Sequence, residues 1–283
     1  MSDLVRVGGA WLEVVNSDVR LGRVRHALFD FDGTLSVIRR GWERVMIPLM
    51  VEMITGGHPA PPGLEQEVAD YVDRSTGILT IKQMQWLEAA VKRYGLAGDV
   101  KSARAYKRIY NERLLAPVRE RIATLDGSLA ARDSLMIAGA RAFLQGLTAR
   151  DVVLYLASGT DHGYVVEEAE ALEVAGYFEG RIYGARDDSE AHDKARVIEE
   201  ILTEHHLEGE ALLVVGDGPV EIRHAKAHGA VALGVAADEA RRRGLDGRKR
   251  ERLLAAGADL LVTDFLQHEA LVDLLVRGDL RQD

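Results

Sequence analysis

Five short apolar runs, each bounded by glycine or aspartate, constrain the fold of this 283-residue chain. They lie at Ala27–Phe31, Val152–Ala157, Ala211–Val215, Ala230–Val235 and Asp259–Val262. Nearly continuous apolar character is typical of strands that are buried on both faces. From residue 152 onward, segments with apolar residues at helical spacing separate the runs. Strands that alternate with helices indicate a parallel sheet, so we expect an α/β fold with a Rossmann-like core.

The strand signal disappears between residues 36 and 130. Apolar residues recur there at helical spacing, from Trp42 to Met53 and again from Ile81 to Tyr94. A helical block of this length is too long for a loop. We therefore expect a helical cap at residues 36–130, inserted into an α/β core formed by residues 1–35 and 131–283. The stretch Trp11–Val15 has strand composition and predicts an N-terminal hairpin.

Composition excludes several classes of function. The formal net charge is −9, which argues against a nucleic-acid partner because Lys and Arg grip phosphate backbones. The chain has no cysteine, which excludes disulfides, thiolate catalysis and thiolate-bound zinc. No apolar run approaches the length of a membrane span, and the first 25 residues lack the apolar core of a signal peptide. We expect a soluble cytoplasmic protein with no membrane partner; its oligomeric state is left open.

Two carboxylates follow the first apolar run, in the sequence Leu-Phe-Asp-Phe-Asp-Gly-Thr-Leu. Residues two apart in a strand point to the same side, so Asp30 and Asp32 project together from the strand end. Gly33 permits a turn directly after them. Like charges this close repel each other unless a cation or a shared proton separates them. The pair therefore indicates a metal site, or one acid and one base.

Further polar residues stand where other predicted strands end. Ser158, Gly159 and Thr160 follow the second run and precede a helical pattern, where a hydroxyl and free backbone N–H groups favour an anion. The alternative is that Ser158, Thr160 or Asp161 only caps that helix. Lys194 begins the next helical pattern. Its positive charge is unfavourable at the N-terminal end of a helix dipole unless a phosphate lies beside it. The alternative is that acidic neighbours offset the charge of Lys194. These neighbours are Asp187, Asp188, Glu190 and Asp193.

The run Ala211–Val215 is followed by Gly216-Asp217-Gly218-Pro219-Val220-Glu221. Asp217 between two glycines suits Mg²⁺, which takes one or two carboxylates with waters and substrate phosphate. Pro219 suits the first position of a helix and Glu221 suits its first turn, so Glu221 has a structural explanation as well. Together the strand ends supply a carboxylate nucleophile, a proton donor, groups for phosphoryl oxygens and metal ligands.

These motifs resemble the haloacid dehalogenase superfamily over about residues 27–235, in order and in spacing. The helical block lies where the helical-cap branch, which includes phosphoglycolate phosphatase and β-phosphoglucomutase, carries its cap. The resemblance implies that Asp30 is the nucleophile and that Asp32 protonates the leaving group and then activates water. It implies that Ser158, Gly159 and Lys194 hold the phosphoryl oxygens. It also implies Mg²⁺ bound by Asp30, the Asp32 backbone carbonyl and Asp217, with Glu221 where the family more often has a second aspartate.

Asp32 discriminates within the family, because the dehalogenases and the phosphonate-cleaving branch lack it. An alkoxide leaving group needs a proton near neutral pH, so Asp32 points to phosphate esters. We expect a Mg²⁺-dependent phosphatase for a small phosphorylated metabolite, for example a sugar phosphate. The alternatives are a phosphomutase, for which Arg39, Arg40 and Lys82 are candidate second-anion ligands, and an inactive phosphometabolite-binding protein. The basic run at 241–252 is interpreted as a solvated loop and helix face.

Overall fold

The protein is described by a computed structural model that covers residues 11–186 and 194–278. The strands are β1 (Leu12–Val14), β2 (His26–Phe29), β3 (Val153–Asp161), β4 (Ile182–Ala185), β5 (Leu212–Gly216), β6 (Val231–Val235) and β7 (Leu260–Val262). They form one seven-stranded sheet in the order β1-β7-β6-β5-β2-β3-β4. All neighbouring strands are parallel except β1, which runs antiparallel to β7. The expected α/β fold with a parallel sheet is confirmed.

Helices cover both faces of this sheet and one of its ends. They are α1 (Glu43–Thr55), α2 (Leu64–Arg74), α3 (Thr80–Tyr94), α4 (Ala103–Ala123), α5 (Leu129–Asp133), α6 (Ala140–Thr148), α7 (His162–Ala171), α8 (Lys194–Glu204), α9 (Pro219–Ala227), α10 (Gly247–Ala256) and α11 (His268–Arg277). Short 3₁₀ helices lie at Ala175–Phe178 and Gly209–Ala211.

Alternation along the central strand β2 explains the two layers of helices. Phe29 faces one layer and meets Phe143 of α6 edge-on, with ring centroids 5.9 Å apart. Leu28 faces the other layer and packs with Ile198 of α8 and Ile222 of α9. Successive strand residues point to opposite faces, so a strand that is apolar throughout requires cover on both sides.

Two strands differ from the sequence-based expectations. The predicted N-terminal hairpin is wrong, because β1 pairs with β7, far away in the sequence. Asp259 fixes this pairing: its backbone carbonyl accepts from Val15 and Asn16, and its carboxylate accepts from the Asn16 amide at 2.7 Å. Strand β4 was not predicted, since it is short, contains Gly184 and lies at the sheet edge.

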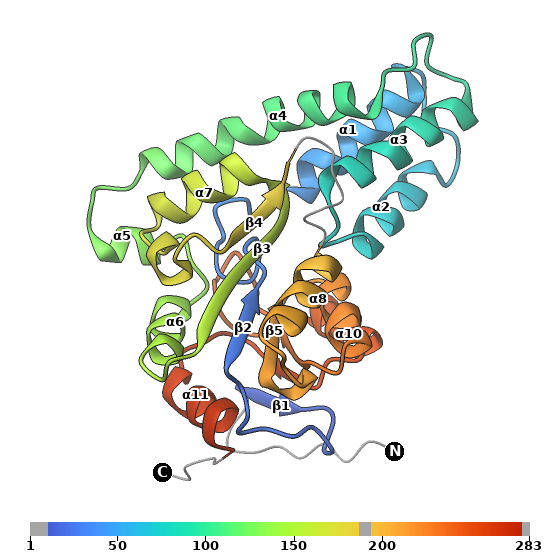
Figure 1. Ribbon diagram of the computed structural model, residues 1–283. Coiled ribbons are helices and arrows are strands. Elements are labelled where there is room, and N and C mark those ends of the chain that lie inside the picture. The colour runs from blue at the N-terminus through green and yellow to red at the C-terminus, as the bar shows by residue number, and fades with distance from the viewer. Residues whose placement is uncertain (1–10, 187–193, 279–283) are drawn as a thin grey trace.

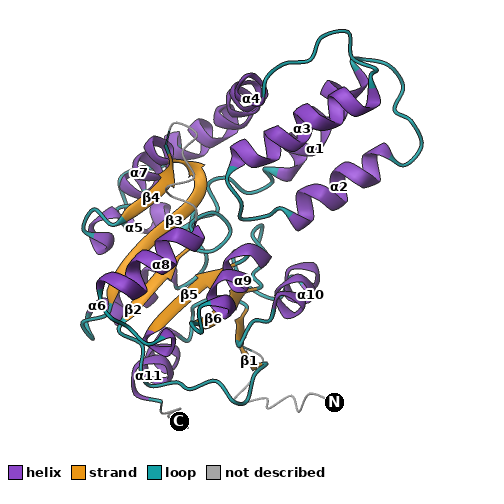
Figure 2. Cartoon of the chain, turned by 45° about the vertical axis from the view of Figure 1, so that its right-hand side comes forward, coloured by secondary structure: helices purple, strands orange, loops and turns teal. Residues whose placement is uncertain are grey.

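Helices α1–α4, which we call the helical cap, lie above the carboxyl ends of the strands (Figures 1 and 2). The described ends of the chain lie at the opposite end of the sheet (Figure 1). The division into a cap at 36–130 and a core at 1–35 and 131–283 stays a prediction, and residues 1–10, 187–193 and 279–283 of that core lie outside the described residues. Among the described helices, none has the length and apolar character to cross a membrane.

A buried histidine at the base of the sheet predicts acid sensitivity. The His26 ring lies 3.1 Å from the Tyr155 hydroxyl, which in turn lies 2.8 Å from His205. Burial, followed by the charges of His205 and Arg181, lowers the pKa of His26 to about 4. The unfolded chain therefore binds this proton first, near its ordinary pKa of 6.5. Stability from neutral His26 is complete above that pH and is lost as the pH falls through about 4.

We expect His26→Gln to lose less thermal stability on acidification than the parent protein. Between pH 7.5 and 5, on the order of 1 kcal/mol of unfolding free energy should separate their responses. For a chain of this size that corresponds to about 2–4 °C in melting temperature. Thermal unfolding at both pH values measures the difference. Equal losses in the two proteins would show that His26 does not carry the effect.

Candidate active site

Strand β2 delivers two aspartates to the centre of the strand ends. The Asp30 N–H donates to the Val215 carbonyl at 2.9 Å, which extends the β2–β5 pairing by one residue. Gly33 then turns the chain with φ of 78°. A Cβ on Gly33 would lie 2.4 Å from an oxygen of the Asp217 carboxylate, so only glycine permits this approach. The turn brings the Asp217 loop against the Asp30–Asp32 segment.

Asp30 is buried beside a lysine and further carboxylates. Its side chain is 6% exposed, and its Oδ1 accepts from Lys194 Nζ at 2.7 Å. The same ammonium donates to Glu221 Oε1. Burial raises the pKa of Asp30 well above its ordinary value; Lys194 opposes this rise, and Glu221 and Asp217 add to it. Burial disfavours the charge on Lys194, but Asp30 and Glu221 together raise its pKa. The site therefore has an excess of negative charge around one fixed ammonium.

Asp32 is held by the residues that follow Ala157 in β3. Its Oδ2 accepts from the Ser158 hydroxyl at 3.3 Å and from the Thr160 hydroxyl at 3.2 Å. Burial raises the pKa of Asp32, while Arg39 and the bond from Thr160 oppose the rise. A carboxyl group that retains its proton more readily than usual suits a proton donor. The helix α7 begins at His162, and its N-cap residue Asp161 makes no side-chain cap bond. Since the Ser158 and Thr160 hydroxyls bond to Asp32 instead, the capping alternative is wrong for all three residues.

Arg39 forms a buried ion pair next to Asp32. Its Nε lies 3.0 Å from both carboxylate oxygens of Glu168 on α7, and its Nη2 lies 2.6 Å from one of them. The distance from Nε to Asp32 Oδ1 is 3.9 Å. Burial raises the pKa of Glu168 to about 7, against the attraction of Arg39. The candidate second-anion ligand Arg39 is therefore already engaged by two carboxylates.

Glu221 lies under the loop that joins α2 to α3. Its Oε1 accepts from Lys194, and no hydrogen-bond partner within the described chain is recorded for its buried Oε2. A Cβ on Gly77, whose φ is 94°, would lie 2.4 Å from Glu221 Oε1, so the cap backbone passes directly over this carboxylate. The ion pair with Lys194 gives Glu221 a role in holding the site; its metal role stays a prediction.

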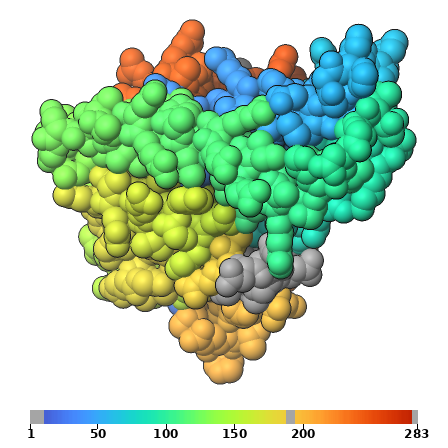
Figure 3. All heavy atoms as spheres, turned by 90° about the horizontal axis from the view of Figure 1, so that it is seen from above, coloured from blue at the N-terminus to red at the C-terminus, as the bar shows by residue number. Residues whose placement is uncertain are grey.

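The cap closes the strand ends into a pocket of about 580 Å³, counting the part that is open to solvent. Asp30, Asp32, Ser158, Gly159, Lys194 and Asp217 line it from the core. Trp42, Ile78, Thr80, Gln83, Tyr110 and Leu114 line it from the cap side. Arg39 is in its wall, whereas Arg40 and Lys82 are not among the residues that line it. In the view onto the cap, the green part of the chain that includes α4 lies beside the yellow part that includes α7 (Figure 3).

Sequence comparison identifies the family of the chain. Residues 24–229 match the model of the haloacid dehalogenase-like hydrolase family. The chain belongs to this family. A search of curated proteins gave no match.

Solved structures agree on the fold. A phosphonoacetaldehyde hydrolase-like protein from Oleispira antarctica has a TM-score of 0.59 and 15% identity, over 94% of this chain and 99% of its own. A "predicted phosphatase" from Clostridium acetobutylicum has a TM-score of 0.57 and 17% identity, over 89% and 99%. A candidate β-phosphoglucomutase from Bacteroides vulgatus has a TM-score of 0.56 and 13% identity, over 93% of each chain. At these identities the likeness shows the haloacid dehalogenase-like fold alone.

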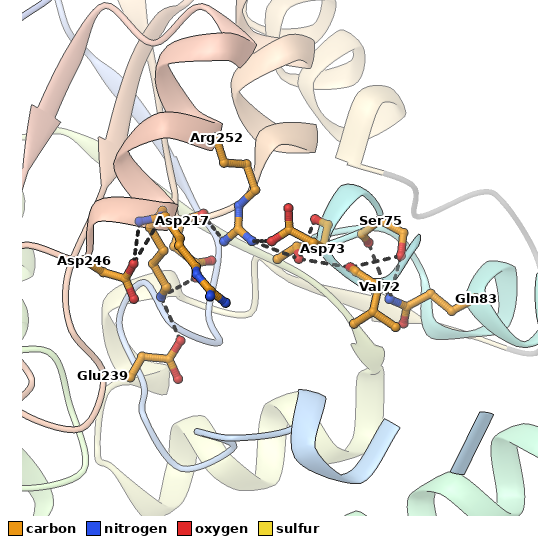
Figure 4. Close-up of polar contacts among 11 residues, drawn as sticks. Val72, Asp73, Ser75, Gln83, Asp217, Glu239, Asp246 and Arg252 are labelled. Atoms are coloured by element: carbon orange, nitrogen blue, oxygen red, sulfur yellow. Dashed lines mark hydrogen bonds and ion pairs between the residues drawn. The ribbon is translucent and has the colours of Figure 1, made fainter. Parts of the chain in front are cut away.

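A lysine that the sequence patterns did not indicate lies against Asp217. Lys249 on α10 is buried, and its Nζ lies 2.6 Å from Asp217 Oδ2 and 2.7 Å from Glu239 Oε1. Arg252, one turn further along, also reaches the Asp217 loop (Figure 4). The interpretation of residues 241–252 as a solvated face is therefore wrong for these two residues. Lys249 shares its helix face with the buried Leu253, and that spacing could have revealed its burial.

The residues present fit a magnesium ion, although no group of three His, Asp or Glu side chains that could hold a metal occurs among the residues described. Asp30 and Asp217 are buried carboxylates close enough for Asp217 to raise the pKa of Asp30. A divalent cation between them would relieve that repulsion. Mg²⁺ needs only one or two carboxylates, with waters and other oxygens as its remaining ligands. The acidic neighbours invoked above for Lys194, residues 187–193, lie outside the described residues.

The cap loop passes so close to Gly159 that a substitution there tests the contact between cap and core. A Cβ at this position would lie 2.2 Å from the Ile78 carbonyl oxygen and 2.9 Å from its carbon. Because backbone atoms cannot move aside cheaply, Gly159→Ala should displace the cap loop and lower kcat/KM about tenfold or more. The matched control is Gly163→Ala on α7, where nothing lies within 4 Å of the new Cβ. Steady-state kinetics and melting temperatures of both variants check this. Equal kinetics would contradict a close cap contact.

Proposed function

We propose that the chain is a Mg²⁺-dependent phosphatase that hydrolyses a small phosphate monoester through an aspartyl-phosphate intermediate. One observation carries the proposal. Asp30 lies against the buried Lys194, and Asp32 is bonded to Ser158 and Thr160, all within one pocket beneath the cap. A nucleophile, a proton donor and a fixed cation are what phosphate ester hydrolysis requires.

In the first step, the Asp30 carboxylate attacks phosphorus, and the bond between phosphorus and the ester oxygen breaks. Asp32 gives its proton to the departing oxygen, which leaves as an alcohol. In the second step, Asp32 takes a proton from water, the water oxygen bonds to phosphorus, and the Asp30 carboxylate is released with inorganic phosphate. Lys194 and the hydroxyl of Ser158 stabilise the phosphoryl oxygens, as does the Gly159 backbone N–H.

The metal would be held by Asp30, the Asp32 backbone carbonyl and Asp217, with Glu221 as a further candidate ligand. When bound, it supplies positive charge that neutralises the phosphoryl oxygens. Lys249 donates to Oδ2 of Asp217, and among the described residues no bond to the other carboxylate oxygen is found. This arrangement orients the carboxylate before any ligand arrives.

The pocket favours a substrate with one anionic group. Among the described residues that line it, the cations are Lys194, which serves the reacting phosphoryl group, and Arg39, which is paired with Glu168 and Asp32. A phosphomutase needs a second phosphate site, and nothing in the described pocket favours one. We infer a leaving group without charge, held by the cap through Gln83, Thr80 and the rings of Trp42 and Tyr110.

The decisive experiment is a panel of phosphorylated metabolites with Mg²⁺, scored for release of inorganic phosphate. Monophosphates with uncharged leaving groups should react faster than bisphosphates, and EDTA should stop the reaction. A hexose 1-phosphate separates the alternatives, because isomerised sugar phosphate without phosphate release would identify a mutase. Absence of turnover across the panel, including an aryl phosphate, would contradict the phosphatase and favour an inactive binding protein.

A further inference from the structure

Arg252 joins the cap, the core and the Asp217 loop through one guanidinium group. It projects from α10 of the core. Its Nη1 donates to Asp73 Oδ1 at 2.6 Å, at the end of α2 in the cap, and lies 3.5 Å from the Thr76 hydroxyl. Its Nη2 donates to the backbone carbonyl of Asp217 at 3.3 Å. Figure 4 shows the side chain between these two groups of residues.

The cap residues that Arg252 contacts lie at the end of α2 and at the start of the loop that covers the site. Thr76 donates to the Asp73 carbonyl at 3.0 Å, which fixes the start of the loop. A Cβ on Gly218 would lie 3.0 Å from the Thr76 carbonyl oxygen, so this loop packs directly on the core backbone next to Asp217. Gly77 and Ile78 follow and line the pocket. Arg252 therefore acts where the cap loop enters the site.

The contact is polar and partly exposed, which makes it reversible. Side-chain exposure is 15% for Arg252 and 60% for Asp73. A groove lined by residues of α1 and α2 on one side and of α9 and α10 on the other separates cap from core here, and Arg252 and Asp73 both line it. An ion pair of this exposure is worth little more than about 1 kcal/mol, so it can break and form again at low cost.

We propose that Arg252 is a positioning residue that latches the cap: its guanidinium holds the Asp73–Thr76 segment closed over the pocket while it anchors the Asp217 loop. Arg252 does not touch the reacting atoms. The latch acts by raising the fraction of molecules in which the cap is closed. The size of this shift is set by the free energy of one ion pair. The inference rests on the proposed function for its catalytic meaning, but the closure itself does not require a substrate.

Hydrogen exchange of the backbone amides at residues 72–80 tests the latch directly. We expect Asp73→Asn and Arg252→Gln each to accelerate exchange in this segment about fivefold, with the central strands unchanged. The double variant should exchange no faster than Arg252→Gln alone, because both substitutions remove the same contact. Matched controls are Asp70→Asn, one turn earlier on α2, and Arg248→Gln, one turn earlier on α10 and exposed. Both controls should exchange as the parent protein does.

Kinetics then separate a latch from a structural role. With para-nitrophenyl phosphate, Asp73→Asn should raise KM about fivefold and change kcat by less, with the melting temperature unchanged. If the loop exchanges at the parental rate in both variants, or if the two effects add in the double variant, the latch is wrong. Exchange results stand even if no phosphate ester is hydrolysed, so failure of the latch and failure of the proposed function are distinguishable.

Discussion

Asp30→Asn should abolish phosphatase activity and leave the protein at least as stable as the parent. Asn cannot form the acyl phosphate, so phosphate release should fall roughly 10³-fold or more. The stability result follows from the sign of the pKa shift. Because burial raises the pKa of Asp30 in the folded state, the charged carboxylate disfavours folding above its ordinary pKa of 3.8. Asparagine removes that charge, so the melting temperature in EDTA at pH 7 should not fall.

Asp259→Asn is the matched control for this prediction. Asp259 is also a buried aspartate beside a strand, but it accepts from Lys226 at 2.6 Å and from the Ala232 N–H at 2.9 Å, away from the pocket. Its loss should lower the melting temperature and leave kcat of the folded enzyme unchanged. Asp30→Asn should thus lose activity and keep its stability, whereas Asp259→Asn should lose stability and keep its activity. Full activity in Asp30→Asn would disprove the nucleophile assignment.

The positions of Asp30, Asp32, Ser158 and Asp217 were predictable because each stands where the apolar run of a buried strand ends. Parallel strands bring their carboxyl ends to one edge, so residues distant in sequence become neighbours without further information. The period of two in β2 also fixes the side to which both aspartates point. The family resemblance then assigns a role to each of these groups. The variants described above test these roles.

The cap contribution was not predictable in the same way. Gln83 and Tyr110 lie on helices whose inward faces mix apolar and polar residues, so the periodicity that reveals the helix also hides them. Lys249 and Arg252 sit in a run of basic residues that is typical of a solvated face. Their partners Asp217 and Asp73 are distant in sequence and become known only when the tertiary structure places α10 between cap and site.

Lys194→Met should produce the largest loss of stability. The ammonium bridges Asp30 and Glu221, and all three side chains are less than 7% exposed. Methionine fills a similar volume but leaves two buried carboxylates without their cation. Removal of one partner from a buried ion pair costs about 3–5 kcal/mol. In a chain of this size that corresponds to roughly 10 °C in melting temperature.

The pH dependence and a second substitution identify the cause. Without Lys194, its attraction no longer opposes the effect of burial, so the pKa of Asp30 rises further. The loss of stability is therefore larger at neutral pH and shrinks as the pH falls toward 4. Lys194→Met combined with Glu221→Gln should recover part of the lost stability at pH 7, since only one charge then remains stranded. Phosphatase activity should stay absent in both, because no ammonium faces the phosphoryl oxygens. If the double variant were no more stable than Lys194→Met, the loss would come from packing, and the electrostatic account of this site would have to be abandoned.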